Sequence, residues 1–418
     1  MIRIEKIAII ADDYTGAGDA GIHFARFGRK VELLLHIDAL TRRSRDKIDI
    51  ALTSETRFLD PGAARDVVSD MVRRCLAAGY DRVFKKIDST MRGNPGSEIE
   101  AVLTATGLAA ALICPAMPKT GRTCVDGAIY LDGVPLHRSD IGHDPFHPLS
   151  SSNVADLLRL QTDLPIGFIA LKEIEAGEAT LRRTILSLLE RGIRLIVADA
   201  VEDRHLAALA QQLAAGDLLP VGAGGFAEAL ARLCAPEGHE GREGRKLALQ
   251  RPIVSVVGSL TEVSRRQAAH ADQSGLFRTI DIRSDAPAAD IRIACERRLS
   301  DPSRDQPNIL LRVVGGERPD KISREDGERV AEKLGLATAS ICSLVPCRTV
   351  VSTGGSTSMA VAEALGIESV DLIDEILPGI VVGACNQPDG GIEWFISKAG
   401  GFGDDSLLTE IDARCVPV

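Results

Sequence analysis

Residues 5–28 read EKIAIIADDYTGAGDAGIHFARFG. The apolar run that ends at Ala11 is short and continuous, which predicts a strand that is buried on both faces. Asp12 and Asp13 follow directly, at the carboxyl end of that strand, where open parallel sheets bind their ligands. The glycines behind them permit a tight turn, and an apolar stripe then predicts a helix that stops at Gly28. The segment therefore indicates an α/β fold with a binding site at its start.

The acidic pair has a simpler alternative explanation, in which Asp13 and Thr15 merely cap the helix and the glycines merely turn the chain. A cap needs only one acidic side chain, however, and two adjacent carboxylates repel each other. A cation, a substrate hydroxyl group or both explain the pair better. Asp12 and Asp13 are therefore candidate substrate-binding and catalytic residues.

The length of 418 residues predicts two domains, each with its own core. Residues 236–251 mix glycine, proline and charge without an apolar period, which is typical of a linker. We therefore expect an N-terminal domain over residues 1–235 and a C-terminal domain over residues 252–418. Strand-length apolar runs alternate with helical patterns in both. This pattern predicts two α/β domains with mainly parallel sheets flanked by helices, and a ligand cleft between them.

The amino-acid composition limits the kinds of molecule that this protein is expected to bind. With 45% hydrophobic and 26% charged residues, no apolar run of membrane length and no signal-peptide pattern, we expect a cytoplasmic protein without a membrane partner. A net charge of −10 and only 3% aromatic residues argue against nucleic-acid binding and favour small molecules. Nine cysteines without CxxC spacing argue against a disulfide framework or a zinc site. The histidines within residues 137–147 fit a structured loop better than a metal site, so no metal-ligating residues are predicted.

A second polar cluster lies in KKIDSTMRGNPGSEIE, residues 85–100, directly after a predicted strand. A guanidinium fork can bind a carboxylate through two parallel hydrogen bonds, so Arg92 suits an acidic substrate, with Ser89 and Asn94 binding its hydroxyl groups. The alternative is a charged, solvated loop. Because this cluster and the acidic pair both follow strands, we expect one pocket that includes Lys86, Asp88, Ser89, Arg92 and Asn94.

Two further arginines follow other predicted strands. Arg57 either faces the same pocket or forms an exposed salt bridge. Arg122, after a turn-rich segment, is another possible anion ligand. Residues 128–136, AIYLDGVPL, then predict a hairpin that turns at Asp132 and Gly133. This hairpin would wall the pocket or pair two subunits, which makes a homodimer possible.

Glycine-rich turns follow three predicted strands in the C-terminal half. A strand, a turn with glycines and hydroxyl groups, and a helix can surround phosphate oxygens with backbone N–H groups. Each turn alone could be an ordinary loop, but three in one domain predict a nucleotide site, which is not of the Walker type because no GK[ST] follows. The predicted residues are Ser259, Thr353, Gly354, Gly355, Ser356, Gly400, Gly401 and Gly403, with Lys398 as a catalytic point charge beside them.

Together these motifs resemble those of the four-carbon acid sugar kinases. The markers are ADDYTGAGD, KKIDSTMRGNPGSEIE, PAMPKTGR with the hairpin behind it, STGGST and KAGGFGD, and they span both halves of the chain. The resemblance implies a sugar-acid domain followed by a nucleotide domain, with ATP phosphorylating the terminal hydroxyl of a tetronate. The KKIDST-RGN form looks more like the D-threonate and D-erythronate kinases than the 3-oxo-tetronate kinases. Matching motif positions assign the substrate to Asp12, Asp13, Arg57, Lys86, Asp88 and Arg92, and ATP to Ser259, Gly354, Gly355, Ser356, Gly401 and Gly403.

The expected mechanism combines these groups. Asp12 or Asp13 accepts the proton of the substrate hydroxyl, and Arg92 holds the carboxylate. Lys398, the glycine turns and Mg²⁺ stabilise the transferring phosphoryl group. The chain departs from the family pattern at Tyr14, at Pro95 and, with more consequence, at Ser356, where an acidic residue is frequent. That departure puts the ATP and Mg²⁺ contacts in question.

Three other functions are compatible with parts of the sequence. TGAGD at residues 15–19 matches a ribokinase-like motif, but in those kinases it lies late in the chain and here it follows the first strand. A non-catalytic sugar-acid sensor needs the arginines but not three phosphate-binding turns. A dehydrogenase is disfavoured because no strand leads into a full GxGxxG turn.

Overall fold

The computed structural model describes residues 6–42, 48–143, 148–239, 241, 247–259, 261–300, 308–314, 324–387 and 391–415. The chain forms two compact units, one of residues 1–32 and 36–242 and one of residues 33–35 and 243–418. The change of unit at 242–243 falls within the segment predicted as a linker, and the predicted domain bounds remain a prediction. None of the helices in the described ranges is long and apolar enough to cross a membrane.

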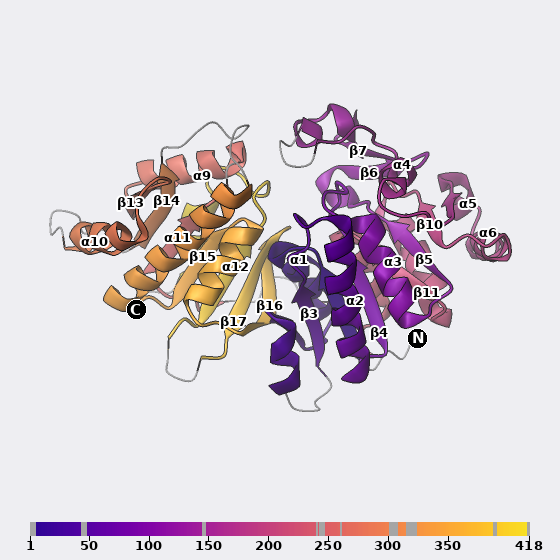
Figure 1. Ribbon diagram of the computed structural model, residues 1–418, viewed down its shortest axis with the longest axis horizontal. Helices are drawn as coiled ribbons and strands as arrows, with labels where there is room; N and C mark the ends of the chain where they lie inside the picture. The colour runs from indigo at the N-terminus through magenta and orange to yellow at the C-terminus, as the bar shows by residue number, and fades with distance from the viewer. Residues whose placement is uncertain are drawn as a thin grey trace. The chain divides into compact units, whose positions relative to one another are not determined.

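The first unit is organised around a sheet in which every pairing from β3 to β9 is parallel (Figure 1). Strands β1, β3 and β5 are buried along their whole length, which explains the uninterrupted apolar sequences of β1 and β5. The order is β2 (Val31–Leu34), β3 (Asp49–Thr53), β1 (Ile7–Ala11), β4 (Arg82–Lys86), β11 (Leu218–Gly222), β5 (Ala110–Cys114), β10 (Leu195–Ala198) and β9 (Ile166–Ile169).

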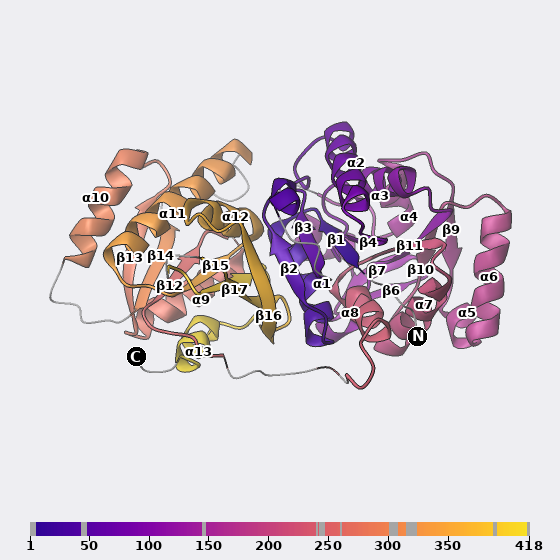
Figure 2. The ribbon, with the colours of Figure 1, turned by 90° about the horizontal axis from the view of Figure 1, so that it is seen from below.

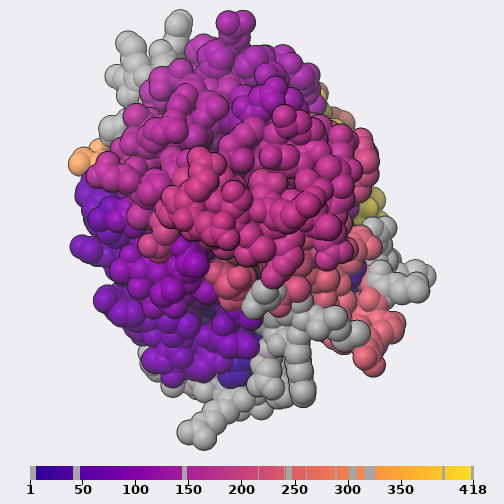
Figure 3. Space-filling model, turned by 90° about the vertical axis from the view of Figure 1, so that its right-hand side faces the viewer, coloured from indigo at the N-terminus to yellow at the C-terminus, as the bar shows by residue number. Residues whose placement is uncertain are grey.

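Helices cover both faces of this sheet (Figure 2). On one face α2 (Pro61–Ala77) packs on α3 (Pro95–Thr106), and on the other α8 (Gly224–Leu233) packs on α1 (Tyr14–Arg26) and α7 (Asp203–Gln211). The short helix α4 (Val154–Arg159) lies against α3. Beyond the edge strand β9, α5 (Leu171–Glu175) and α6 (Glu178–Glu190) form the end of the unit that faces the viewer in Figure 3.

A separate three-stranded antiparallel sheet contains β6 (Arg122–Val125), β7 (Ala128–Leu131) and β8 (Val134–Pro135). The predicted hairpin is confirmed, because Leu131 pairs with Val134 across a turn at Asp132 and Gly133. Both turn residues have positive φ, 49° and 79°, as a two-residue hairpin turn requires. A second Asp-Gly turn joins β6 to β7, and the sequence analysis missed it.

The second unit has a mixed sheet. Pairings are parallel from β13 to β18 and antiparallel from β18 to β16. Its order is β13 (Phe277–Arg283), β14 (Asn308–Val314), β12 (Ile253–Val257), β15 (Thr349–Thr353), β18 (Trp394–Lys398), β17 (Ile380–Cys385) and β16 (Ser369–Leu377). Packed helices are α10 (Ala288–Leu299) on α11 (Arg324–Leu344), α11 on α12 (Gly355–Ala364), and α9 (Glu262–Gln273) on α13 (Leu407–Ala413). The predicted fold class, α/β with mainly parallel sheets, is confirmed.

Candidate active site

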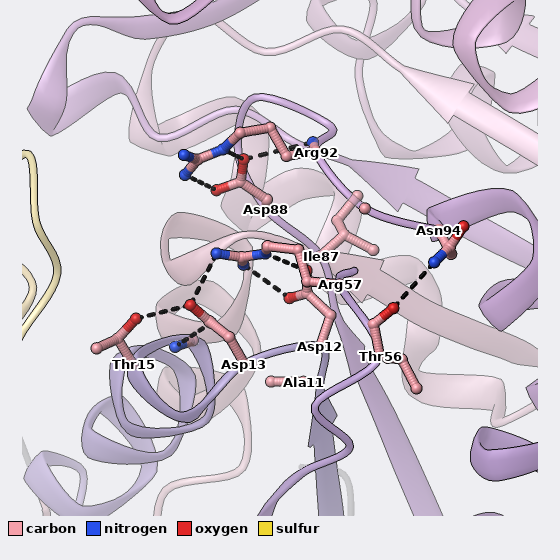
Figure 4. Close-up of polar contacts among 12 residues, drawn as sticks. Ala11, Asp12, Asp13, Thr15, Thr56, Arg57, Ile87, Asp88, Arg92 and Asn94 are labelled. Atoms are coloured by element: carbon pink, nitrogen blue, oxygen red, sulfur yellow. Dashed lines mark hydrogen bonds and ion pairs between the residues drawn. The ribbon is translucent and has the colours of Figure 1, made fainter. Parts of the chain in front are cut away.

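Arg57 joins the two adjacent carboxylates at the end of β1 (Figure 4). Its Nε and Nη2 donate to the two oxygens of Asp12, at 2.7 and 3.0 Å, and its Nη1 donates to Asp13 Oδ2 at 2.7 Å. Burial alone would raise the pKa of Asp12, but the charge and hydrogen bonds of Arg57 outweigh it and lower that pKa. Arg57 therefore supplies the cation that the acidic pair requires, and the exposed salt bridge considered for it does not occur.

Asp13 has a second role as the cap of α1. Its side chain accepts hydrogen bonds from the backbone N–H of Gly16 at 2.8 Å and from the hydroxyl of Thr15 at 2.9 Å. The capping alternative is thus correct for Asp13, but it accounts for only one of the two aspartates. Asp12 is buried, and its carboxylate serves the ion pair with Arg57.

The loop after β4 is organised by Asp88. Arg92 donates to it from Nε at 2.7 Å and from Nη2 at 3.3 Å, and the Thr90 hydroxyl donates as well. Burial would raise the pKa of Asp88, but the charge of Arg92 heads the opposing interactions, which hold that pKa well below its ordinary value. In this structure the guanidinium of Arg92 already binds a carboxylate of the protein, and its binding of a substrate carboxylate stays a prediction.

Asn94 fastens this loop to the loop after β3. Its side-chain amide donates to the backbone oxygens of Thr56 at 2.9 Å and Leu59 at 2.8 Å, so its donors are not directed at a substrate hydroxyl as predicted. Gly93 between the two loops has φ of 86°, and a Cβ there would lie 3.1 Å from Asp12 Oδ2. Only glycine fits that position without strain. Ser89, another predicted residue, is buried in the same loop.

Two lysines at the end of β4 lie beneath these loops. Lys85, which is fully buried, pairs with Glu98 of α3 at 2.7 Å, and Glu98 also accepts from Thr56. Lys86 lies 3.4 Å from Asp19 of α1 and donates to a backbone oxygen. The sequence analysis missed Glu98, because an acid in the first turn of a helix has an ordinary explanation in the helix dipole.

The turns of the second unit converge around Ser259. A Cβ on Gly400 would lie 2.5 Å from Ser259 Oγ, and one on Gly354 would lie 3.5 Å from its Cβ. The backbone N–H of Gly354 donates to Lys398 O at 2.8 Å. The predicted nucleotide turns after β12, β15 and β18 are therefore neighbours. Gly355 begins α12, Ser356 is exposed on its first turn, and no side chain caps that helix.

This arrangement fits a phosphate group. The first N–H groups of a helix have no partner within the helix and carry its positive dipole end. Thr353 is buried at the end of β15, whereas Gly401 is exposed and Gly403 has φ of 77° in the turn after β18. Among the residues that the structure describes, no group of three or more His, Cys, Asp or Glu side chains could hold a metal ion.

The ammonium of Lys398 is directed at protein groups, and not at the position that its predicted role beside a phosphate requires. Its ammonium donates to the backbone oxygens of Ala399 at 3.1 Å and Gly400 at 3.0 Å and to Ser264 Oγ at 3.3 Å, and the side chain is fully buried. Burial lowers its pKa to about 7. In this conformation Lys398 supports the glycine turn from beneath and is not a phosphate-facing charge.

We expect the Lys85–Glu98 pair to be a main support of the first unit. Glu98→Ala leaves a fully buried ammonium without its carboxylate, which should lower the free energy of unfolding by about 3–5 kcal/mol. Glu100→Ala, two residues along the same helix, removes a partly exposed pair with Arg65 and a hydrogen bond from the Thr162 hydroxyl, and should cost about 1–2 kcal/mol. Urea unfolding measures both, and equal costs would contradict the assignment.

Glu55 makes the stability of this unit depend on pH. Burial raises the pKa of its carboxyl group from 4.5 to about 7, with smaller contributions from Asp13 and Asp12. Protonated Glu55 therefore stabilises the fold fully below pH 4.5, and this contribution is lost as the pH rises to about 7. The difference in unfolding free energy between the wild type and Glu55→Gln should change across this window and be constant above it. Parallel stability curves in urea unfolding would rule this out.

Each of the two groups of loops lies in a part of the chain that matches its own family model. A family model described as a sugar-binding N-terminal domain matches residues 7–230, and one described as a nucleotide-binding C-terminal domain matches residues 254–408. A solved structure from Salmonella typhimurium LT2, described as a putative tRNA synthase, has a TM-score of 0.82 and 23% identity, and covers 99% of this chain and 100% of its own. At that identity the likeness shows the fold alone.

Curated relatives span nearly the whole chain. A D-threonate kinase of Salmonella typhimurium LT2 is 32% identical over 422 residues, with 97% of each chain covered. A D-erythronate kinase of Heliobacterium modesticaldum is 28% identical, covering 99% of this chain and 100% of the relative. A 3-oxo-tetronate kinase of Methylobacterium radiotolerans is 26% identical, covering 95% and 96%. With these relatives and both domain matches, the chain belongs to the four-carbon acid sugar kinase family and is a phosphotransferase.

Proposed function

We propose that this chain transfers the γ-phosphoryl group of ATP to the terminal (4-) hydroxyl of D-threonate or D-erythronate. The observation that carries this proposal is the buried, charge-compensated cluster at the carboxyl edge of the sugar-binding unit. Full-length similarity to a D-threonate and a D-erythronate kinase supports it, and a 3-oxo-tetronate is the second candidate, since a more distant relative has that name.

The proposal gives the acidic pair a modest form of base catalysis. Arg57 lowers the pKa of Asp12 and also donates to Asp13, and the carboxylate oxygens of the pair can accept a hydrogen bond from the substrate hydroxyl. A carboxylate with a lowered pKa is a weak base, but phosphoryl transfer with a loose transition state needs alignment more than early proton removal. The pair thus orients the hydroxyl oxygen and takes up its proton as the new O–P bond forms, while the bond from the γ-phosphorus to the bridging oxygen breaks and ADP leaves.

The second unit would hold the phosphates. The turns around Ser259, Gly354 and Gly400 offer backbone N–H groups, and Lys398 keeps the last turn in shape. When bound, Mg²⁺ supplies the charge that neutralises the phosphate oxygens. Ser356 is exposed beside Gly355, so it can contact a phosphate but offers no carboxylate for the metal.

A coupled assay of ADP release tests this function across D-threonate, D-erythronate and the two 3-oxo-tetronates, with ATP and Mg²⁺. We expect the highest kcat/KM for D-threonate or D-erythronate. Highest activity with a 3-oxo acid would mean that a 3-oxo-tetronate is the substrate in place of D-threonate or D-erythronate. Binding without turnover would indicate a sensor, and no response to any of the acids would overturn the tetronate assignment.

Replacing the aspartates tests their role. Asp12→Asn and Asp13→Asn should each lower kcat by about 100-fold or more. Asp70→Asn, on the exposed side of α2, is the matched control and should leave kcat unchanged. Melting temperatures are measured in parallel because Asp13 also caps α1. Near-normal turnover in both site variants would sink the proposed role.

A further inference from the structure

In the proposed function the acidic pair takes the hydroxyl proton, but it is poorly suited to keep that proton. Arg57 donates three hydrogen bonds to the two carboxylates (Figure 4). Burial opposes the effect of Arg57 on Asp12, but the charge of the arginine prevails and lowers the pKa of Asp12. A carboxylate with a lowered pKa gives a proton up readily at neutral pH. The reaction therefore gains from a further group beside the pair that holds the proton while the products form.

Glu55 lies in the loop that is held against this pair. The loop follows β3, whose last residue, Thr53, is beside Ala11 of β1 in the parallel register. Residues on both sides of Glu55 bind the end of β1. The backbone N–H and the hydroxyl of Ser54 both donate to Ala11 O at 2.8 Å, and Arg57 binds the two aspartates that follow. Glu55 is thus fixed between two attachments to the segment that carries the acidic pair.

The conformation of Glu55 is unusual for its residue type. Its φ is 49°, in the left-handed region that is unfavourable for residues other than glycine and that recurs at functional sites. The hydroxyl of Thr53 donates to Glu55 Oε1, so the side chain is oriented toward the end of β3. Glu55 is only partly buried, so its carboxyl group can exchange a proton with water. The loop therefore holds a third carboxyl group in a defined place beside the pair.

The charged groups that act on Glu55 come from the end of β1 and from its own loop. Burial raises the pKa of Glu55 to about 7, and Asp13 and, more weakly, Asp12 act in the same direction. The hydroxyl of Thr53 and the charge of Arg57 oppose the increase. A group that titrates near neutral pH can take a proton during the reaction and release it afterwards, which suits a general base. Glu55 therefore has the property that Asp12 lacks.

We propose that Glu55 is the final acceptor of the substrate hydroxyl proton, which reaches it by way of the acidic pair. This inference rests on the proposed function and deepens it. As the O–H bond breaks, the proton passes through an aspartate to the Glu55 carboxylate, and the oxygen keeps the electron pair and bonds to the γ-phosphorus. The bond from that phosphorus to the bridging oxygen breaks, and ADP leaves with its electron pair. Glu55 then releases the proton to water.

The test is the pH dependence of kcat/KM for the four-carbon acid that the wild type phosphorylates best, at saturating ATP and Mg²⁺. Wild-type kcat/KM should fall below about pH 7, in proportion to the ionised fraction of Glu55. Glu55→Gln should lose this acidic limb, and its kcat/KM above the limb should be about 10- to 100-fold lower. A merely structural role would lower kcat/KM at every pH and leave the limb in place. Glu190→Gln, at the exposed end of α6, is the matched control and should keep the wild-type profile.

Glu55→Asp keeps a carboxyl group on a shorter side chain, so the limb should remain with a shifted midpoint. This variant decides the matter if the glutamine variant does not fold, and an unchanged midpoint then overturns the inference. A wild-type profile without an ionisation near pH 7, or an unchanged limb in Glu55→Gln, overturns the inference alone and leaves the proposed function standing. If the wild type phosphorylates no four-carbon acid, the proposed function fails, and this inference fails with it.

Discussion

The structure of the sugar-binding unit depends on compensating negative charge at the end of a buried strand. Asp12 and Asp13 are adjacent and nearly inaccessible to water, so their repulsion must be met inside the protein. Arg57 meets it by bridging both carboxylates, and this brings the loop after β3 over the end of β1. The loop after β4 then packs against Asp12 at Gly93. Because glycine has no side chain, this position leaves room for the Asp12 carboxylate.

The same principle extends through the rest of the edge. Lys85 with Glu98 and Arg92 with Asp88 are further oppositely charged pairs, each joining or shaping a loop that follows a strand. In this cluster each acidic side chain has a basic partner that fixes its position. Such preorganisation suits phosphoryl transfer, in which the acceptor oxygen must be aligned before the bond forms.

Much of this architecture could be predicted from sequence, for a physical reason. Parallel strands covered on both faces are continuous apolar runs, so β1 and β12 were recognisable, and the glycine turns behind β15 and β18 marked the candidate nucleotide loops. Pairing partners could not be predicted. Arg57 reaches carboxylates more than forty positions away, and nothing local shows that Arg92 turns back onto Asp88.

The direction of Lys398 escaped prediction for a similar reason. A lysine beside three glycines is typical of a phosphate ligand. In the structure, however, the backbone oxygens of the glycine turn accept hydrogen bonds from the ammonium of this lysine. Hydrogen bonding to carbonyls and to Ser264 makes burial of the side chain tolerable. Lys398 thus illustrates that residue type and spacing indicate a site, while the local supply of donors and acceptors decides what each side chain does.

The central claim is that the sugar acid binds the edge around Asp12 and that the nucleotide binds the turns around Ser259. Amide hydrogen exchange followed by mass spectrometry tests this most directly. D-threonate alone should slow exchange in residues 12–16, 54–58 and 86–94, and a non-hydrolysable ATP analogue alone should slow it in residues 261–264, 353–358 and 398–403. Protection of the first set by the nucleotide, or no protection of it by the acid, would contradict the account.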